Sequence, residues 1–143
     1  MVRNNFFSGG ITIHNTYFAN NIAINIGTAS FTATSSLIRN NISQGANVFP
    51  AGNGNQGNFT IAQIMLNTGS TDGRFRLAAG SPAIGAGESV GGITPDCGPF
   101  GTADPYRLSG IPAIPTIYSL TVPGSVPAAS TSMNITLSTR SNN

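Results

Sequence analysis

The sequence predicts an all-β chain in which short strands stack into a solenoid, and three observations support this. A phrase of twelve residues that begins at Ile11 reappears, with substitutions, twenty residues later at Phe31. Apolar and polar residues alternate within each copy, which is typical of strands. Helix-forming residues cluster nowhere, whereas Val, Ile, Phe and Thr are common. A unit of about twenty residues is too small to bury its own apolar face, so it stacks on its neighbour.

The two copies correspond closely enough to predict a core. Thr12 and Thr32 are identical, as are Ile22 and Ile42, and most apolar residues of one copy match apolar residues of the other. Matching positions of stacked repeats share a side-chain direction. We therefore expect one buried stack, which comprises Ile11, Ile13, Phe18, Ile22, Leu37, Ile38 and Ile42.

Each repeat divides into short runs that are separated by turn residues. The predicted strands are 11–13, 16–18, 22–26, 31–33, 36–38 and 46–49. Three short strands per repeat, joined by bends, are the geometry of one turn of a parallel β-helix. Equivalent strands would then pair in parallel at about 4.8 Å. Residues 2–10 are interpreted as the tail of an earlier repeat, with Asn4–Phe7 aligned on Asn15–Phe18.

Two Asn-Asn pairs mark the bends: Asn20-Asn21 and Asn40-Asn41. Asn tolerates the left-handed backbone of a sharp bend. Equivalent Asn side chains in stacked repeats can also hydrogen-bond to one another as a ladder. These four residues are therefore predicted to be structural, and a glycan-binding row of asparagines is the alternative.

The region after residue 49 is less regular. Residues 50–57 are a loop by composition, 59–66 a strand or short helix, and 67–73 a second turn-rich break. The phrase that follows contains Phe75, Leu77, Gly80-Ser81-Pro82-Ala83-Ile84 and Ala86-Gly87. It resembles F-x-L-x-x-G-S-P-A-I-D-A-G, with which secreted bacterial proteins of the right-handed parallel β-helix fold often close.

The resemblance covers about residues 2–100 and implies a right-handed β-helix with turn roles for Gly80, Ser81, Pro82 and Gly87. Gly85 stands where the family usually has a turn-forming Asp, and Cys97 stands in the Ile position of the following D-I-G segment. The resemblance also implies an extracellular or cell-surface location. It does not imply an activity, because such scaffolds carry lyases, hydrolases, adhesins and structural proteins.

The remainder of the chain is predicted to be a connector and a ribbon. Residues 101–115 are punctuated by Pro, which favours an extended path. Alternating runs at 116–122 and 132–138 predict an antiparallel pair. The expected organisation is therefore 1–100 for the repeats and closing segment, 101–115 for the connector and 116–143 for the ribbon. Because two strands alone are marginally stable, the ribbon is expected to pack on another surface.

Composition excludes several classes of partner. The six basic residues, all Arg, are dispersed, so they form no stripe for nucleic acid. The sequence contains no run of about 18 apolar residues, so it predicts no membrane-spanning helix. The first residues lack the apolar region of a secretory signal, and we expect the chain to be the end of a longer parent protein. A single Cys excludes an internal disulfide.

Candidate catalytic residues are few. Residues 1–71 contain no Asp or Glu, so they cannot supply paired carboxylates or a Ca²⁺ site. The four acids, which lie in turns or connectors, are expected to be structural: Asp72, Glu88, Asp96 and Asp104. His14, the only histidine, is expected to be satisfied or solvent-facing rather than a catalytic base. We assign no catalytic residue, metal ligand or cofactor.

The aromatic residues near the N-terminus admit two interpretations. A sugar-stacking stripe is one, and core stacking is favoured because these positions are apolar in the second copy. The residues are Phe6, Phe7, Tyr17 and Phe18.

Three functional hypotheses remain. The first is a non-catalytic structural or adhesive module of a secreted or cell-surface protein. The second is the closing cap of a carbohydrate-active enzyme, a polysaccharide lyase or glycoside hydrolase, whose active site lies upstream. The third is a self-assembling fibre subunit. Expected partners are further copies of the chain, bound through open strand edges, with surface polysaccharide as a second candidate.

Overall fold

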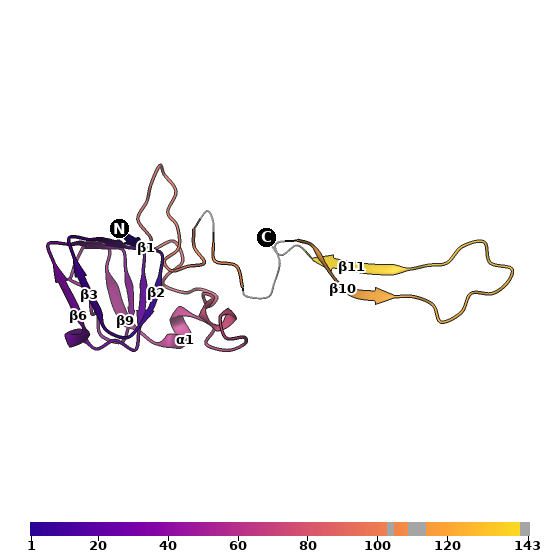
Figure 1. Ribbon diagram of the computed structural model, residues 1–143, viewed down its shortest axis with the longest axis horizontal. Coiled ribbons are helices and arrows are strands. Elements are labelled where there is room, and N and C mark those ends of the chain that lie inside the picture. Colours follow the sequence, from indigo (N-terminus) through magenta and orange to yellow (C-terminus); the bar gives the residue numbers. More distant parts are fainter. Residues whose placement is uncertain (103–104, 109–113, 141–143) are drawn as a thin grey trace. The chain divides into compact units, whose positions relative to one another are not determined.

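The chain divides into two compact units, Met1–Tyr106 and Arg107–Asn143. The computed structural model describes residues 1–102, 105–108 and 114–140. Parts of the predicted connector 101–115, and the end of the predicted ribbon domain, lie outside these residues. Unit 1 holds the repeats and the closing segment, and unit 2 holds an antiparallel ribbon (Figure 1).

Nine short strands of unit 1 form three parallel sheets. One sheet has the order β1-β4-β7, a second β2-β5-β8-β9 and a third β3-β6. The strands are β1 (Val2–Arg3), β2 (Phe6–Ser8), β3 (Ile11–His14), β4 (Tyr17–Ala19), β5 (Ile22–Ile24), β6 (Phe31–Thr34), β7 (Leu37–Arg39), β8 (Ile42–Gln44) and β9 (Gln56–Phe59).

The register of the sheets follows the sequence repeat. Ile11 pairs with Phe31, Phe18 with Ile38, and Ile22 with Ile42, which is a shift of twenty residues in all three sheets. Consecutive strands of one repeat therefore belong to three different sheets, and equivalent strands of successive repeats are hydrogen-bonded. The all-β class and the parallel pairing are confirmed. The three sheets are separate, and none closes on itself among the described residues.

The strands of the first repeat pair with those of the second in a register that differs from the predicted alignment. Val2 pairs with Phe18 and Phe6 with Ile22, so the shift here is sixteen residues. The alignment of Asn4–Phe7 on Asn15–Phe18 was therefore wrong. The cause is the connection to the next repeat: Gly9-Gly10 joins β2 to β3, whereas the longer segment 25–30, which includes the 3₁₀ helix Thr28–Ser30, joins β5 to β6.

The third repeat also departs from the predicted strands. The segment 46–49 forms no strand, although its last two residues, Val48 and Phe49, are buried. The stretch 59–66 contains a single helical turn, α1 (Ile61–Ile64), which Thr60 and Gln63 cap reciprocally. A second 3₁₀ helix covers Gly73–Phe75.

Unit 1 has two hydrophobic clusters instead of the single stack that was predicted. The inner cluster comprises Ile11, Ile13, Phe18, Ala23, Ile26, Ile38, Val48 and Phe49. The outer cluster comprises Ile22, Ile24, Ile42, Ile64, Met65, Ala83 and Cys97. Ala23 lies in the inner cluster and its neighbours Ile22 and Ile24 in the outer one. The sheet β2-β5-β8-β9 is therefore buried on both faces, and the segment that follows β9 covers its outer face.

Six of the seven residues predicted to be buried are buried, and Leu37 is not. Leu37 is 47% exposed, and Tyr17, which pairs with it in the sheet, is partly exposed. The next residue in each strand, Phe18 or Ile38, is buried instead. Because successive side chains point to opposite faces, only one residue of each adjacent apolar pair can enter the inner cluster.

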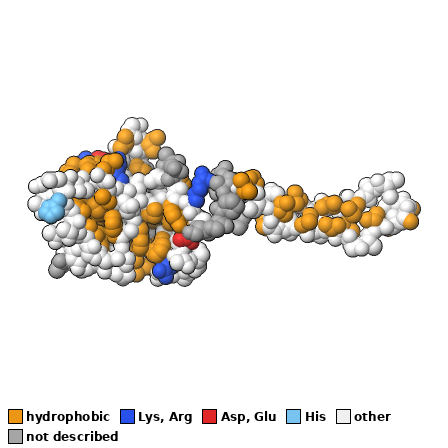
Figure 2. All heavy atoms as spheres, in the orientation of Figure 1, with side chains coloured by type: hydrophobic (Ala, Val, Ile, Leu, Met, Phe, Trp, Pro, Cys, Tyr) orange, Lys and Arg blue, Asp and Glu red, His pale blue; other side chains and the backbone are white. Residues whose placement is uncertain are grey.

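Unit 2 contains β10 (Thr116–Thr121) and β11 (Thr136–Arg140), which pair antiparallel as predicted. The second strand begins four residues later than predicted. Leu120 pairs with Leu137 and Thr121 with Thr136, and the register shifts between Ile117 and Ser119. Apolar side chains along the ribbon are exposed (Figure 2).

Candidate functional site

The first Asn of each Asn-Asn pair shapes the bend between two sheets. Asn20 and Asn40 adopt φ values of 56° and 52°, and Asn4 adopts 57° at the equivalent bend of the first repeat. This left-handed backbone costs most side chains about 1–2 kcal/mol, and Asn adopts it more readily. The first Asn therefore turns the chain from the sheet β1-β4-β7 into the sheet β2-β5-β8-β9.

The second Asn of each pair belongs to a ladder of four side chains. The Oδ1 atom of Asn41 accepts hydrogen bonds from the backbone N–H (2.9 Å) and the Nδ2 (3.0 Å) of Asn21. Asn5 donates to Asn21 in the same way, and Asn41 donates to Asn55. Asn21 and Asn41 are fully buried. The side chains of Asn21, Asn41 and Asn55 thus each accept from the Asn of the preceding repeat.

The closing segment, residues 81–98, is fastened to these bends. Asn20 accepts at its Oδ1 from the N–H of Glu88 (2.8 Å) and at its backbone oxygen from the N–H of Gly98 (2.8 Å). Asn40 donates from its Nδ2 to the backbone oxygen of Ala86 (3.0 Å), and its own backbone oxygen accepts from the Sγ of Cys97 (3.2 Å). Asn20 and Asn40 therefore act twice, in the bend and as docking points.

The residues of the closing phrase have local roles. The Oγ of buried Ser81 donates to the backbone oxygen of Ile64 (2.7 Å) and accepts from the N–H of Ala83. Gly80 has φ +71°, and Pro82, next to buried Ser81, is partly buried. Gly87 lies against Pro95, whose oxygen a Cβ at position 87 would meet at 2.6 Å. Gly85, at the family's Asp position, donates to the carboxylate of Asp96 (2.8 Å).

Glu88 brings together charged and polar groups from three successive strands. Its Oε1 lies 2.7 Å from Nη1 of Arg39, and its Oε2 lies 3.4 Å from Nη2 of Arg3. The hydroxyl of Tyr17 donates to the same Oε2. We call Arg3, Tyr17, Arg39 and Glu88 the Glu88 cluster. It is the densest group of ionisable side chains among the described residues, so it is the candidate site.

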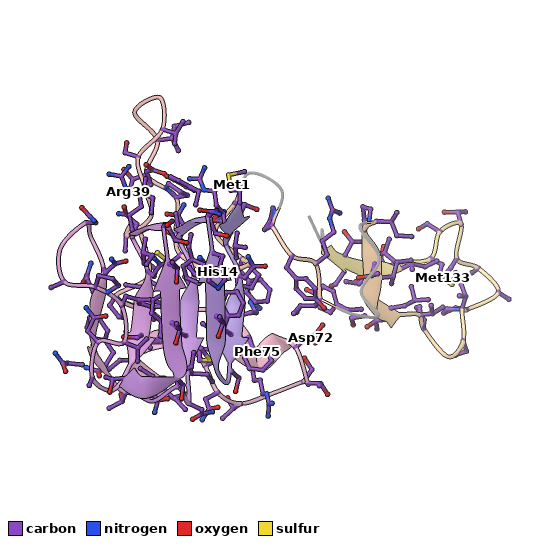
Figure 3. The ribbon with its side chains drawn as sticks, turned by 60° about the vertical axis from the view of Figure 1, so that its left-hand side comes forward. Met1, His14, Arg39, Asp72, Phe75 and Met133 are labelled. Atoms are coloured by element: carbon purple, nitrogen blue, oxygen red, sulfur yellow. The ribbon has the colours of Figure 1, made fainter. Side chains whose placement is uncertain are left out.

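The sheet register explains why one carboxylate reaches both arginines. Arg3 pairs with Ala19 and Ala19 with Arg39, so a fully buried Ala separates the two arginines across the sheet. The small side chain leaves space between them for the carboxylate. Arg39 lies beside the loop that carries Glu88 (Figure 3), and this loop stands next to β1 (Figure 1).

The electrostatics favour a structural contact over proton transfer. Two guanidinium groups surround a single carboxylate, which is about 20% exposed. Burial, followed by the hydrogen bond to Glu88, raises the pKa of Tyr17 above its ordinary value of 10.0. A phenol with a raised pKa remains protonated at neutral pH, so Tyr17 is a hydrogen-bond donor and not a general base.

The other described acids lie apart from the cluster in local roles. Asp72 accepts from Ser70 (3.2 Å) and from the hydroxyl of Tyr106 (3.2 Å), and Asp96 accepts from Gly85. Asp104 lies outside the described residues. The Glu88 cluster thus contains one carboxylate, whereas glycoside hydrolysis by the usual route uses two.

His14 and Cys97 lie in different parts of unit 1. His14 is exposed on β3, where it pairs with Thr34 (Figure 3). Cys97 is fully buried, and burial, with a smaller contribution from the charge of Asp96, raises its pKa from 9.0 to about 12. Within residues 1–102, 105–108 and 114–140, no group of three or more His, Cys, Asp or Glu side chains could hold a metal ion.

The aromatic residues near the N-terminus divide between three environments. Phe7 packs against Phe18 in the inner cluster with ring centroids 5.5 Å apart, and Phe6 packs against Phe75 in the outer cluster at 4.4 Å. Tyr17 is outside both clusters, with Arg3 over its ring at 5.7 Å. Core stacking therefore holds for three of the four, and the prediction was wrong for Tyr17.

Comparison with protein-family models, curated proteins and solved structures gave no match. In the described part of the chain, no helix has the length and apolar character needed to cross a membrane.

Proposed function

We propose that the chain is a short right-handed parallel β-helix with a C-terminal ribbon, and that it serves as a non-catalytic structural or adhesive module of a secreted or cell-surface protein. The β-helix interpretation is supported by the shared twenty-residue register of three parallel sheets and by the closing phrase at Phe75–Gly87. In this interpretation each repeat is one coil.

The observation that carries the non-catalytic proposal is the engagement of the Glu88 cluster. Its one carboxylate accepts from Arg3, Tyr17 and Arg39, which come from three successive coils, and Tyr17 is held protonated. The groups that an enzyme would direct at a substrate thus bind one another. Their arrangement links coils, which is what a load-resistant scaffold requires.

The proposed partners are further copies of the chain. Among the described residues, β1, β2 and β3 each lie at the edge of a sheet, and an edge strand can pair with a strand of another chain. Only Arg3 and His14 place an ionisable side chain on these strands, and none contains Pro. Surface polysaccharide is the other proposed partner, since neutral polar side chains dominate the exterior of these strands.

The proposal is tested with the purified chain and acidic polysaccharides. Incubation with pectins and alginates, with and without Ca²⁺, should release no unsaturated or reducing ends. Turnover of a polysaccharide would overturn the proposal if Arg39→Ala or His14→Ala abolished it. Arg76→Ala, at an exposed arginine, is the control and should leave such turnover intact. Turnover of this kind would favour the alternative of a carbohydrate-active enzyme.

A further inference from the structure

The ribbon of unit 2 has one apolar and one hydroxylic face. Leu120 pairs with Leu137, and Ile117 pairs with Thr139. The adjacent pairs, Ser119 with Ser138 and Thr121 with Thr136, point to the opposite face because side chains alternate. The register shifts between Ile117 and Ser119, and Ile117 still lies on the side of Leu120 because its partner Thr139 is two residues from Leu137. Tyr118, two residues before Leu120, alternates onto the same side.

The apolar face extends a step beyond the last strand pair. Val122 follows Thr121 and Ile135 precedes Thr136, so alternation places both on the side of Leu120 and Leu137. All six apolar side chains are about half exposed: Ile117 61%, Tyr118 65%, Leu120 59%, Val122 48%, Ile135 53% and Leu137 53%. Figure 2 shows apolar side chains running along much of the ribbon.

The size of this face suits an interface between two proteins. Six half-exposed side chains at roughly 90 Å² of apolar surface each present roughly 500 Å² in total, which is comparable with the largest apolar patch of a typical monomer, a patch that is often functional. A standard interface buries about 800 Å² per partner, of which about 65% is apolar in homodimers. The apolar face therefore supplies about what one half of a stable dimer needs.

The charge pattern indicates which partner fits. Residues 114–139 contain no Asp, Glu, Lys, Arg or His. The apolar face therefore offers no charge by which a foreign surface could be selected, and two such faces meet without like-charge repulsion between residues 114–139. An isolated pair of strands is also marginally stable in water, whereas two ribbons packed face to face form a four-stranded, two-layer core.

We propose that the apolar face of the ribbon packs against the same face of a second copy, in a two-fold symmetric dimer centred on Leu120 and Leu137. The contact is isologous, so it closes at two chains. This inference rests on the proposed self-association, and it uses a surface different from the strand edges of β1, β2 and β3.

The test compares two single substitutions on adjacent residues of β11 in the full chain. Sedimentation at tens of micromolar should show a dimer for the unchanged chain. Leu137→Asp buries an unpaired charge at the interface and should weaken dimerisation at least about a hundredfold. Ser138→Asp adds the same charge on the opposite face and should leave the dimer intact. Buried Cys97 should stay unreactive toward a thiol reagent in all three proteins, which verifies that unit 1 is folded.

A second measurement locates the contact. Leu137→Cys should form a disulfide between two copies under mild oxidation, whereas Ser138→Cys should not. A monomeric unchanged chain, or a dimer that Leu137→Asp leaves intact, would overturn the inference. The second of these results would place self-association at the strand edges. Neither bears on catalysis, which the polysaccharide incubation tests separately.

Discussion

The carboxylate of Glu88 contacts the guanidinium of Arg39 at 2.7 Å, although the two residues are 49 positions apart in the sequence. The same carboxylate accepts from Arg3, which is 85 residues away. One side chain of the closing segment thus connects strands of the first and third repeats.

Removal of the Glu88 charge should lower stability by a modest amount. Glu88→Gln is expected to reduce the free energy of unfolding by about 1–2 kcal/mol, since the contacts are charge-assisted but partly exposed. Chemical denaturation would measure the change. Arg39→Met combined with Glu88→Gln should cost less than the two single changes added together. Arg76→Met, at an exposed arginine, should change stability little. Additive effects at positions 39 and 88 would show that the pair contributes nothing.

The two members of an Asn-Asn pair should respond differently to substitution. Asn41→Ala removes the acceptor of two buried donors on Asn21, so we expect a loss of about 3 kcal/mol, and Asn41→Gly should be at least as harmful. At position 40, Gly adopts the left-handed backbone and Ala does not. Asn40→Gly should therefore be milder than Asn40→Ala by about 1 kcal/mol. Thermal or denaturant unfolding would rank the four variants, and equal effects of Gly and Ala at position 40 would contradict the bend role.

Gly87 should tolerate no side chain. A Cβ there would meet the backbone oxygen of Pro95 at 2.6 Å, so Gly87→Ala should destabilise the protein by about 1–3 kcal/mol and loosen the closing segment. Hydrogen exchange of the amides of Cys97 and Gly98 would report the loosening. Gly10→Ala is the matched control, because the nearest atom to its Cβ is Ser30 O at 3.5 Å. A stable Gly87→Ala protein with unchanged exchange would disprove the close packing.

Alkaline pH should destabilise unit 1 through Cys97 and Tyr17. Both groups have a pKa that is raised in the folded protein, so their contribution to stability is fully present at pH values below their pKa in the unfolded chain. This contribution is lost as pH rises from about 9 towards 12, because the unfolded chain releases these protons more readily than the folded protein does. Denaturant unfolding across this range should show a steady loss, which Cys97→Ser should reduce. A flat profile for the unchanged chain would contradict the expectation.

The sequence repeat was sufficient to predict the parallel register but not every member of the ladder. Asn21 and Asn41 are twenty residues apart, and the matching phrases around them make their equivalence visible. Asn5 and Asn55 lie sixteen and fourteen residues from their partners, because the connections between repeats differ in length. A search of the sequence at a fixed period of twenty residues therefore does not identify Asn5 and Asn55 as members of the ladder.

The faces of very short strands were harder to assign. β4 and β7 have three residues each, and both contain two adjacent apolar side chains. Alternation alone does not say which of Leu37 and Ile38 points inward, because the bends on either side of the strand decide which of its faces turns toward the core. The Glu88 cluster was invisible for another reason: its contacts depend on where the closing segment crosses the sheet, and no local pattern encodes that crossing.

The contact of Glu88 with both arginines also limits how this protein could have grown. Duplication of a repeat between Arg3 and Arg39 would separate their strands by a further 4.8 Å or so. One carboxylate, which already spans three strands across Ala19, could then no longer reach both guanidinium groups. A repeat duplicated within residues 3–39 would therefore break one of the two contacts of Glu88, whereas a repeat added outside this interval would leave both in place.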